Sequence, residues 1–253
     1  MGQQALTGWI LGCLLLSLRV GPVFMFAPPF SLVRMPMLVR ILLSLGIAAC
    51  VLSSKPDAAR EIGTQTGMLV AAALNELLLG SVFVLALQLA FGGLYIAGRT
   101  IDIQAGFGLS LLIDPTTRGQ TPLVGTLFAY AAGAVFFALD GHLDLLRIMA
   151  ASLDAVPLGA WHLPVSLDML TAFIATMMTI AFGIAGAAML ALFLADLAIA
   201  LLSRTVPQMN VLVLGFQVKT VLLLLTLPVT FGVAGSLFVR FVAVTLEALP
   251  GLI

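Results

Sequence analysis

The chain has 253 residues, of which 62% are hydrophobic and 9% are charged, and its formal net charge at pH 7 is zero. Because soluble domains are roughly 45–50% apolar, this composition excludes an ordinary soluble protein, and the neutral charge balance gives no indication of nucleic-acid binding. Apolar runs without charge recur along the chain, each near or above the ~20 residues that cross a bilayer as a helix: residues 77–98, 119–139, 169–195 and 220–239. The sequence therefore predicts an all-α, polytopic helical membrane protein.

The first expected helix covers residues 6–20 and ends near Arg19 and Pro22. A signal peptide needs a basic amino-terminal region, and no lysine or arginine precedes Arg19, so we expect this helix to remain in the protein. Three prolines between residues 28 and 36 then predict a bend or a re-entrant connection rather than a straight span. A second, shorter helix is expected over residues 38–52.

The next apolar stretch, residues 62–98, predicts either one long tilted helix or a helix broken near Glu76. It leads into a central segment, residues 97–122, which is polar and rich in glycine between two membrane-length blocks. Two glycines around Phe107 loosen the backbone where it would leave a helix, and Asp114-Pro115 predicts a turn. Non-helical backbone at membrane depth must be buried in protein or line a cavity. The central segment therefore lies outside the bilayer or plugs a space inside the protein.

The carboxy-terminal half predicts a helix over residues 122–139, then a short amphipathic helix, then two long helices over residues 166–202 and 211–239. On the amphipathic helix, charged residues recur at spacings of four and three and so share one face: Asp140, Asp144 and Arg147. The two long helices form a separable hairpin joined by a polar hinge. This pattern divides the chain into residues 1–164 and 165–253.

Charged residues inside the hydrophobic blocks need partners. Each charge near the centre of a membrane helix costs roughly 2.5–3.5 kcal/mol, so Glu76, Asp196 and Lys219 must be paired or hydrated. Asp196 could pair with Lys219 or with Arg204 across the hinge, and this pairing is favoured over a proton or ion relay. We also expect partner chains to cover much of the surface that would otherwise face lipid.

Catalytic and metal-binding patterns are weak in this sequence. His142 lies beside two aspartates, but a metal site needs three or four convergent ligands, so interfacial hydrogen bonding is the better interpretation. The triplet around Phe107 is similar to a potassium-channel filter, yet the preceding Thr-Val is missing, and flexible loop packing is favoured. Cys13 and Cys50 lie in apolar runs and are interpreted as buried thiols. We expect no enzyme activity and no cofactor.

Four stretches together resemble one known family. They are residues 19–40 with their R-V-G-P, A-P-P-F and P-x-x-x-R patterns, residues 104–108 with the following Asp114-Pro115 and Pro122, the turn 141–143, and residues 201–219. In this order they resemble the FliR/SctT family of the type III secretion export gate. One departure is Asp140, which stands where the family pattern has asparagine. The aspartate adds a negative charge at that turn.

The resemblance implies an architecture and a set of partners. Residues 1–164 would form a FliP-like helical part that includes the central segment, and residues 165–253 would form a FliQ-like helical hairpin. The chain would be the single-copy subunit of a closed helical gate, assembled with FliP-like and FliQ-like subunits in the bacterial inner membrane at the flagellar basal body. An FlhB-like subunit would wrap the cytoplasmic end, and an FlhA-like export component would lie nearby.

The resemblance also assigns roles to residues. The central segment corresponds to a plug that obstructs the channel until unfolded flagellar proteins arrive: Gly106, Phe107, Gly108, Leu109, Leu111, Leu112, Ile113, Asp114, Pro115 and Arg118. The hinge of the hairpin corresponds to a partner-contact region: Arg204, Pro207, Gln208, Asn210 and Lys219. The equivalent subunit of a virulence injectisome is the first alternative. A stand-alone ion or solute transporter is a less favoured one, and an intramembrane enzyme is less favoured still.

Overall fold

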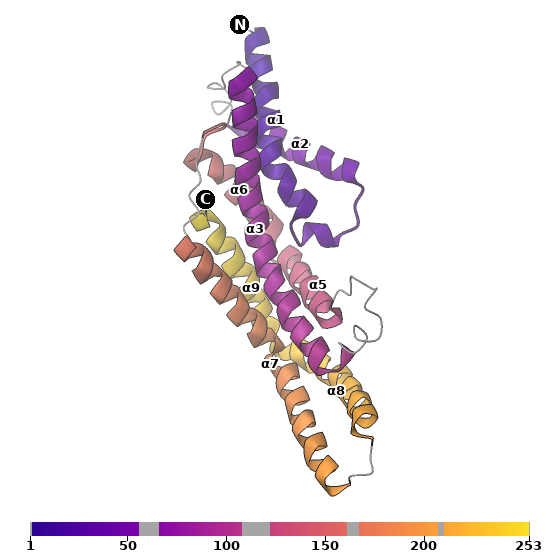
Figure 1. The fold of residues 1–253 in the computed structure, drawn as a ribbon. Coiled ribbons are helices and arrows are strands. Elements are labelled where there is room, and N and C mark those ends of the chain that lie inside the picture. Colours follow the sequence, from indigo (N-terminus) through magenta and orange to yellow (C-terminus); the bar gives the residue numbers. More distant parts are fainter. Residues whose placement is uncertain (1, 56–65, 108–121, 161–166, 207–209, 253) are drawn as a thin grey trace. The chain divides into compact units, whose positions relative to one another are not determined.

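The computed structural model describes residues 2–55, 66–107, 122–160, 167–206 and 210–252. Within these ranges every regular element is a helix, which confirms the all-α prediction (Figure 1). In chain order they are α1 (Gly2–Phe26), η1 (Phe30–Leu32), α2 (Met37–Ser54), α3 (Thr66–Gln104), α5 (Leu123–Ala138), α6 (Gly141–Ala155), α7 (Leu167–Thr205), α8 (Val211–Val233), α9 (Gly235–Ala248) and η4 (Leu249–Leu252).

Most of these helices are long and apolar enough to cross a bilayer. Six qualify among the described residues, and the pair α5 and α6 passes the same test together. The six stretches are Leu6–Phe26, Met37–Ser54, Gly67–Gln104, Leu167–Thr205, Val213–Val233 and Gly235–Leu252. The chain is therefore a polytopic helical membrane protein.

The described helices pack into two compact units drawn from interleaved parts of the chain. Unit 1 comprises residues 1–89, 136–173 and 243–253, and unit 2 comprises residues 90–135 and 174–242. These two units are defined by which parts of the chain pack together. The predicted division into residues 1–164 and 165–253 is of another kind, because it rests on the resemblance of each part to a different subunit. That division stays a prediction.

Helix α1 passes through Pro22 and ends only at Phe26, so the expected end near residue 20 was wrong. A proline inside a helix removes one backbone hydrogen bond, but the following residues Val23 and Phe24 are buried. Phe24 packs on Phe30 with ring centroids 4.6 Å apart. This packing favours continuing the helix past the proline.

The proline-rich connection after α1 is a bend, as predicted. It contains the short helix η1 and a cis bond between Pro28 and Pro29. Arg40 of α2 donates from Nη1 to the Met25 carbonyl (2.7 Å) and from Nη2 to the Val33 carbonyl (2.8 Å). One guanidinium thus binds the Met25 carbonyl in the last turn of α1 and the Val33 carbonyl in the connection, and so ties α2 to both.

The structure also shows whether two of the expected long helices are continuous. Helix α3 is continuous from Thr66 to Gln104, so it is one long helix that is not broken near Glu76. The last expected helix is instead two, α8 and α9, which meet at Ala234. Closely spaced glycines at 232 and 235 weaken helical continuity at this point.

Helix α2 buries only one narrow stripe. Ser44, Ala48 and Leu52 are its buried residues, spaced four apart along one face. Cys50 lies off this stripe and is exposed, whereas Cys13 of α1 is buried. The expectation of a buried thiol was therefore wrong for Cys50, because a helix that packs along a single edge covers few of its side chains.

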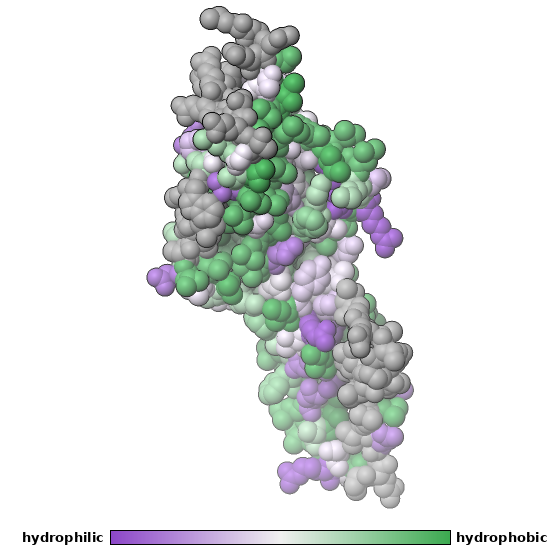
Figure 2. All heavy atoms as spheres, turned by 45° about the horizontal axis from the view of Figure 1, so that its top comes forward, coloured by the Kyte–Doolittle hydropathy of each residue, from purple (hydrophilic) through white to green (hydrophobic). Residues whose placement is uncertain are grey.

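Large apolar side chains remain exposed on the described helices, and Figure 2 shows apolar residues over much of the visible face. In unit 2 they line α7 and α8 at helical spacings, so that each helix keeps an open apolar face: Leu190, Phe193, Leu194, Leu197, Leu201, Val221, Leu224, Leu225 and Val229. A membrane-spanning chain can cover such faces with lipid or with other protein chains.

Candidate functional site at the ends of segment 108–121

The predicted plug falls mostly outside the described residues. Of its ten residues, the structure describes Gly106 and Phe107; the others are Gly108, Leu109, Leu111, Leu112, Ile113, Asp114, Pro115 and Arg118. Of the predicted hinge residues, Arg204, Asn210 and Lys219 are described, and Pro207 and Gln208 are not. The candidate site is therefore described by the residues on either side of segment 108–121: the departing end at the end of α3 and the returning end at the start of α5. Both ends belong to unit 2.

The departing end begins where α3 stops. Gly106 donates its N–H to the carbonyl of Ile103 (3.0 Å), which closes a last tight turn after Gln104. Gly106 has φ +93°, a backbone conformation that side-chain-bearing residues rarely adopt. A Cβ at this position would also lie 3.0 Å from the Phe216 ring. Glycine is thus required here both for the turn and for the close approach of α8.

Phe107 is held by the same helix. Its ring meets that of Phe216 edge-on, with centroids 6.3 Å apart and an interplanar angle of 73°. Edge-to-face aromatic pairs contribute roughly 0.5–1.5 kcal/mol beyond the area they bury. The last described residue before the segment is therefore attached to α8.

Lys219 joins three helices at this end. Its Nζ donates to the carbonyl of Gln104, the last residue of α3, at 3.2 Å, and forms an ion pair with Asp196 of α7. The final carbonyls of a helix carry partial negative charge, so an ammonium group there is favourable. Of the two partners left open by the sequence, Lys219 is the one that pairs with Asp196, and Arg204 lies exposed in the last turn of α7.

The returning end is held by Asp102. Its Oδ1 accepts a hydrogen bond from the N–H of Val124 (3.3 Å) in the first turn of α5. The first N–H groups of a helix have no partner within the helix, and here a carboxylate from α3 supplies one. Asp102 is buried, at 6% exposure, so this contact is shielded from water.

Helices α3 and α5 also touch backbone to backbone beside this contact. A Cβ at Gly98 would overlap the backbone of Gly125, and a Cβ at Gly125 would lie 2.9 Å from the carbonyl of Tyr95. Small residues allow this close approach between membrane helices. Both ends of segment 108–121 thus lie beside the carboxy-terminal part of α3.

The sequence analysis did not predict the role of Asp102, which lies within the polar central segment 97–122. An acceptor that caps a different helix leaves no local pattern in the sequence. Asn210, in contrast, is a conventional N-cap, and its Oδ1 accepts from the N–H of Val213 (3.3 Å). This capping role is local, and the predicted partner contact of Asn210 stays a prediction.

A second polar centre lies inside unit 1. The guanidinium of Arg19 meets the carboxylate of Glu76 through two hydrogen bonds, Nε to Oε2 at 2.6 Å and Nη2 to Oε1 at 3.0 Å. Both side chains are fully buried. This bidentate geometry is the strongest that an arginine and a carboxylate can form, and it supplies the partner that the sequence required for Glu76.

The remaining polar atoms of this pair are also satisfied. Arg19 Nη1 donates to the hydroxyl of Ser152 on α6 (3.0 Å), and Nη2 donates to the carbonyl of Val156 (3.0 Å). Glu76 Oε1 accepts from the N–H of Gly159 (2.9 Å). The network therefore ties α1, α3, α6 and the turn after α6 to one another.

The sequence did not predict this pairing, because Arg19 was interpreted as the end of a helix. With α1 extended to Phe26, Arg19 lies inside the helix, where a lone charge would be costly. An arginine and a glutamate that each interrupt an apolar block were the only available signal.

The other candidates have modest surroundings. The His142 ring packs on the Phe137 ring with centroids 5.7 Å apart, and within the described ranges its buried Nδ1 has no hydrogen-bond partner. In the same ranges, no group of three or more His, Cys, Asp or Glu residues converges as metal ligands would. Asp140 has a left-handed backbone, φ +56°. Asparagine and aspartate are the side chains that adopt this conformation most readily, which fits a turn where the family pattern has asparagine.

Comparison with known proteins decides the family. Residues 10–244 match the sequence model of a family described as bacterial export proteins, family 1. The chain belongs to this family. The match covers both ends of segment 108–121 and the Arg19–Glu76 network, so these features lie within the family's extent.

Individual relatives of this export-protein chain agree with that assignment. The flagellar biosynthetic protein FliR of Bacillus subtilis (strain 168) is 30% identical over 251 residues, covering 95% of this chain and 93% of that protein. FliR of Escherichia coli (strain K12) is 26% identical over 205 residues, covering 79% and 76%. The Yop proteins translocation protein T of Yersinia pestis is 28% identical over 158 residues, covering 61% and 60%. The resemblance to the FliR/SctT family is confirmed.

Proposed function

We propose that this chain is the single-copy subunit of a flagellar type III protein export gate and forms part of the gated channel for unfolded flagellar proteins. The observation that carries the proposal is the similarity to a flagellar biosynthetic protein over 95% of the chain. The similarity to a Yop translocation protein covers only 61%. The flagellar role is therefore favoured over the equivalent injectisome subunit, which remains the second candidate.

The proposal includes partner subunits in the bacterial inner membrane at the flagellar basal body. FliP-like and FliQ-like chains would cover the open apolar faces of α7 and α8, and an FlhB-like subunit would contact the hinge near Arg204 and Asn210. An FlhA-like component would lie nearby. Support comes from the exposed apolar residues on both helices, which a bundle of this chain alone leaves uncovered.

Within the gate, segment 108–121 would act as the plug. Four apolar residues, Leu109, Leu111, Leu112 and Ile113, would fill the lumen. Support comes from the two fixed ends, because a segment attached at Phe107 and at the start of α5 can be displaced without releasing the helices that carry it. The function is passage of substrates, with no catalytic step assigned to this chain.

The test uses a flagellated host that lacks its own subunit. Expression of this chain should restore swimming and secretion of the hook protein. Replacement of residues 108–117 by a glycine–serine stretch of equal length should leave the subunit in the membrane and increase ion permeability, measured as loss of membrane potential. A matched control is Asp168→Asn on the exposed first turn of α7, which should leave permeability unchanged.

Three outcomes would contradict the proposal. Failure to restore motility, together with rescue of an injectisome mutant, would favour the second candidate. Unchanged ion permeability after the replacement would contradict the plug assignment. Purification in mild detergent as an oligomer of identical chains would favour a stand-alone transporter, whereas co-purification with FliP-like and FliQ-like chains supports the gate.

A further inference from the structure

Arg99 of α3 is an exposed charge within an apolar face of unit 2. Four residues of this face follow one another at spacings of four, three and four, which keep them on one side of the helix: Gly92, Ile96, Arg99 and Ile103. Ile96 and Ile103 are 48% and 58% exposed. The exposed apolar surface thus continues on both sides of the arginine, so the charge does not lie at the edge of that surface.

Within the described part of unit 2, no carboxylate forms an ion pair with Arg99. Asp102 lies one turn further along α3, but it is buried and its Oδ1 accepts from the N–H of Val124. The Oδ2 atom of Asp102 is also buried and has no hydrogen-bond partner among the described residues, so it does not bind the Arg99 guanidinium. Asp196 pairs with Lys219. The charge of Arg99 is therefore left for a group outside these residues to neutralise.

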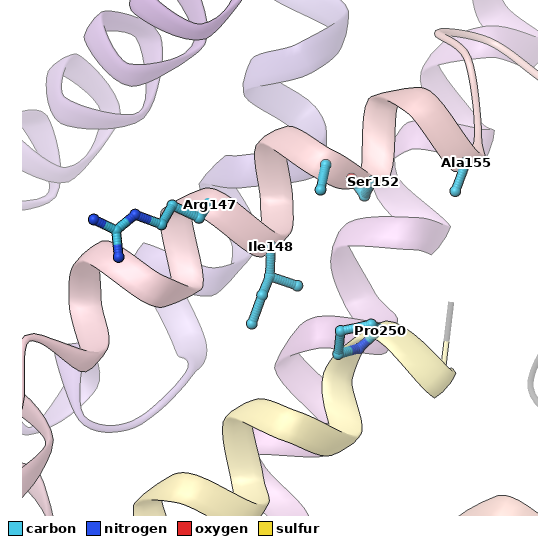
Figure 3. Close-up of a pocket in the computed structure, with 6 residues that line it drawn as sticks. Arg147, Ile148, Ser152, Ala155 and Pro250 are labelled. Atoms are coloured by element: carbon cyan, nitrogen blue, oxygen red, sulfur yellow. The ribbon is translucent and has the colours of Figure 1, made fainter.

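Arg147 of α6 shows how the chain can neutralise an exposed arginine by itself. Its Nη1 lies 2.7 Å from Oδ1 of Asp144, which precedes it by three residues on the same helix. The Arg147 side chain points away from Ile148 and Pro250, which line an apolar groove beside η4 (Figure 3). At Arg99 the residues three before and four after are isoleucines, so its exposed face supplies no such carboxylate.

Arg240 of α9 is also exposed, but its face of the helix is polar. Ser236 precedes it by four residues and Glu247 follows it by seven, and both are exposed on the same side. Water or lipid headgroups can solvate an arginine on such a face. On the apolar face of α3, in contrast, the charge of Arg99 is unfavourable unless a counter-charge lies beside it.

The geometry of this face favours another helix as its partner. Residues at spacings of three and four form the seam along which two helices pack. A Cβ at Gly92 would meet no atom within 4 Å, so the seam is open at this position. Small residues let membrane helices approach closely, as Gly98 and Gly125 do between α3 and α5. The open glycine in the seam therefore indicates a second backbone and not a lipid tail.

The chemistry of the seam indicates what that helix carries. A guanidinium presents its N–H donors in one plane, and a carboxylate can accept two of them at once. Arg19 and Glu76 form this bidentate pair inside unit 1. The exposed isoleucines on either side of Arg99 call for apolar side chains before and after the carboxylate of the partner. The occupant that fits is an apolar membrane helix with one Asp or Glu on its contact face.

We propose that the seam of Gly92, Ile96, Arg99 and Ile103 docks a membrane helix of another chain, and that an Asp or Glu of that helix pairs with Arg99. The inference rests on the proposed function, because an export gate of several chains supplies such a neighbour. It adds a contact surface on α3 to those proposed on α7, on α8 and at the hinge.

The test uses the full chain, assembled with its partner subunits in the membrane of the flagellated host. A photo-crosslinking residue at Ile96 or at Ile103 labels whatever lies beside Arg99, and mass spectrometry of the crosslinked peptide identifies it. We expect both positions to label one membrane helix of another chain, with an Asp or Glu within one turn of the labelled residue.

Charge exchange then tests the pair itself. Arg99→Glu should lower the crosslink yield about tenfold, because two like charges would face each other, and Arg99→Lys should retain most of the yield. Changing the acidic residue of the partner to Arg should cause the same loss in the unaltered chain, which tests the pair even where Arg99→Glu does not reach the membrane. The two reversals together should restore the yield. Arg240→Glu, the matched control, should leave it unchanged.

Several results would overturn the docking proposal. They are a label on lipid, on residues 108–121 of the same chain, on a second copy of this chain, or on a helix with no acidic residue within one turn. An equal loss in Arg240→Glu, or a double reversal that restores nothing, would overturn it as well. Restored swimming with a label on lipid would contradict this inference alone. A confirmed acidic helix in cells that do not swim would contradict the export role alone.

Discussion

Two ion pairs, one in each unit, hold helices together in different ways. In unit 1, the side chains of Arg19 and Glu76 are both 0% exposed, and their remaining polar atoms bind Ser152, Val156 and Gly159. In unit 2, the side chains of Lys219 and Asp196 are 19% and 42% exposed. Water can replace the second pair at little cost but cannot reach the first. Any change in the arrangement of α1, α3 and α6 would therefore leave buried charges without partners, whereas the end of α3 in unit 2 is held by contacts that water can replace.

The largest effect is expected from breaking the buried pair. Glu76→Leu or Arg19→Met alone leaves an uncompensated buried charge and should destabilise the protein by about 3–5 kcal/mol. The double variant removes both charges and should recover much of that loss. Reversible unfolding of the purified chain in detergent measures both, and Glu247→Gln, an exposed change in unit 1, should stay within about 0.5 kcal/mol of wild type. A double variant no more stable than the singles would show that the network, and not the pair, fixes the helices.

A smaller effect is expected at the returning end of segment 108–121. Asp102→Leu removes the acceptor of the buried Val124 N–H and should cost about 1–3 kcal/mol. Asp102→Asn keeps an acceptor oxygen at the same place and should recover most of that stability. Hydrogen exchange of the first amides of α5 measures the local loss, and equal protection in both variants would contradict the capping role.

The exchangeable pair of unit 2 should matter less still. Lys219→Met removes the contacts with Asp196 and with the Gln104 carbonyl and should cost about 1 kcal/mol. We expect faster amide exchange at Ala105 and Gly106, with α7 unaffected. Lys219→Arg should restore protection. A loss as large as that of Glu76→Leu would erase the contrast between the two units.

The smallest effect is expected from the exposed pair on α6. Asp144 and Arg147 are three residues apart on a helix surface, and such pairs contribute about 0.3–0.5 kcal/mol. A double-mutant cycle with Asp144→Ala and Arg147→Ala measures the coupling, which should fall further at high salt. A coupling above that of Lys219 with Asp196 would show that burial does not rank these pairs.

The helices themselves follow from the hydrophobic pattern, and the exceptions have local causes. Residues 38–52 and 166–202 were located to within a few residues, because long apolar runs leave few alternatives in a membrane. Pro22 was misjudged, since the burial of Val23 and Phe24 outweighs one missing hydrogen bond. The break at Ala234 was not predicted, because glycines such as those at 232 and 235 are also frequent in membrane helices that stay continuous.

The polar contacts were harder to predict than the helices. The cost of burying a charge predicted that Glu76 needs a partner, but it did not identify Arg19 as that partner. Arg19 lies far from Glu76 in the sequence, and the predicted first helix ended near residue 20, which placed Arg19 at its end instead of inside it. Asp102 acts on another helix, so no pattern of spacing could reveal it. Asp196 and Lys219 were found because they flank one hinge, where closeness in sequence restricts the choice to two cations.

The composition of unit 1 has a consequence for how the protein is made. Its residues come from the beginning, the middle and the stretch 243–253 of the chain. Chains emerge from the ribosome at roughly 5–20 residues per second. Arg19 is therefore synthesised before its partners: Glu76 follows first and Ser152 later, at a stage when α7 and α8 have not yet been translated. During that interval the charge of Arg19 can be neutralised by Glu76, but two of its hydrogen-bond acceptors, the Ser152 hydroxyl and the Val156 carbonyl, are still missing. A nascent chain that stalls before α6 would therefore carry an incomplete polar centre.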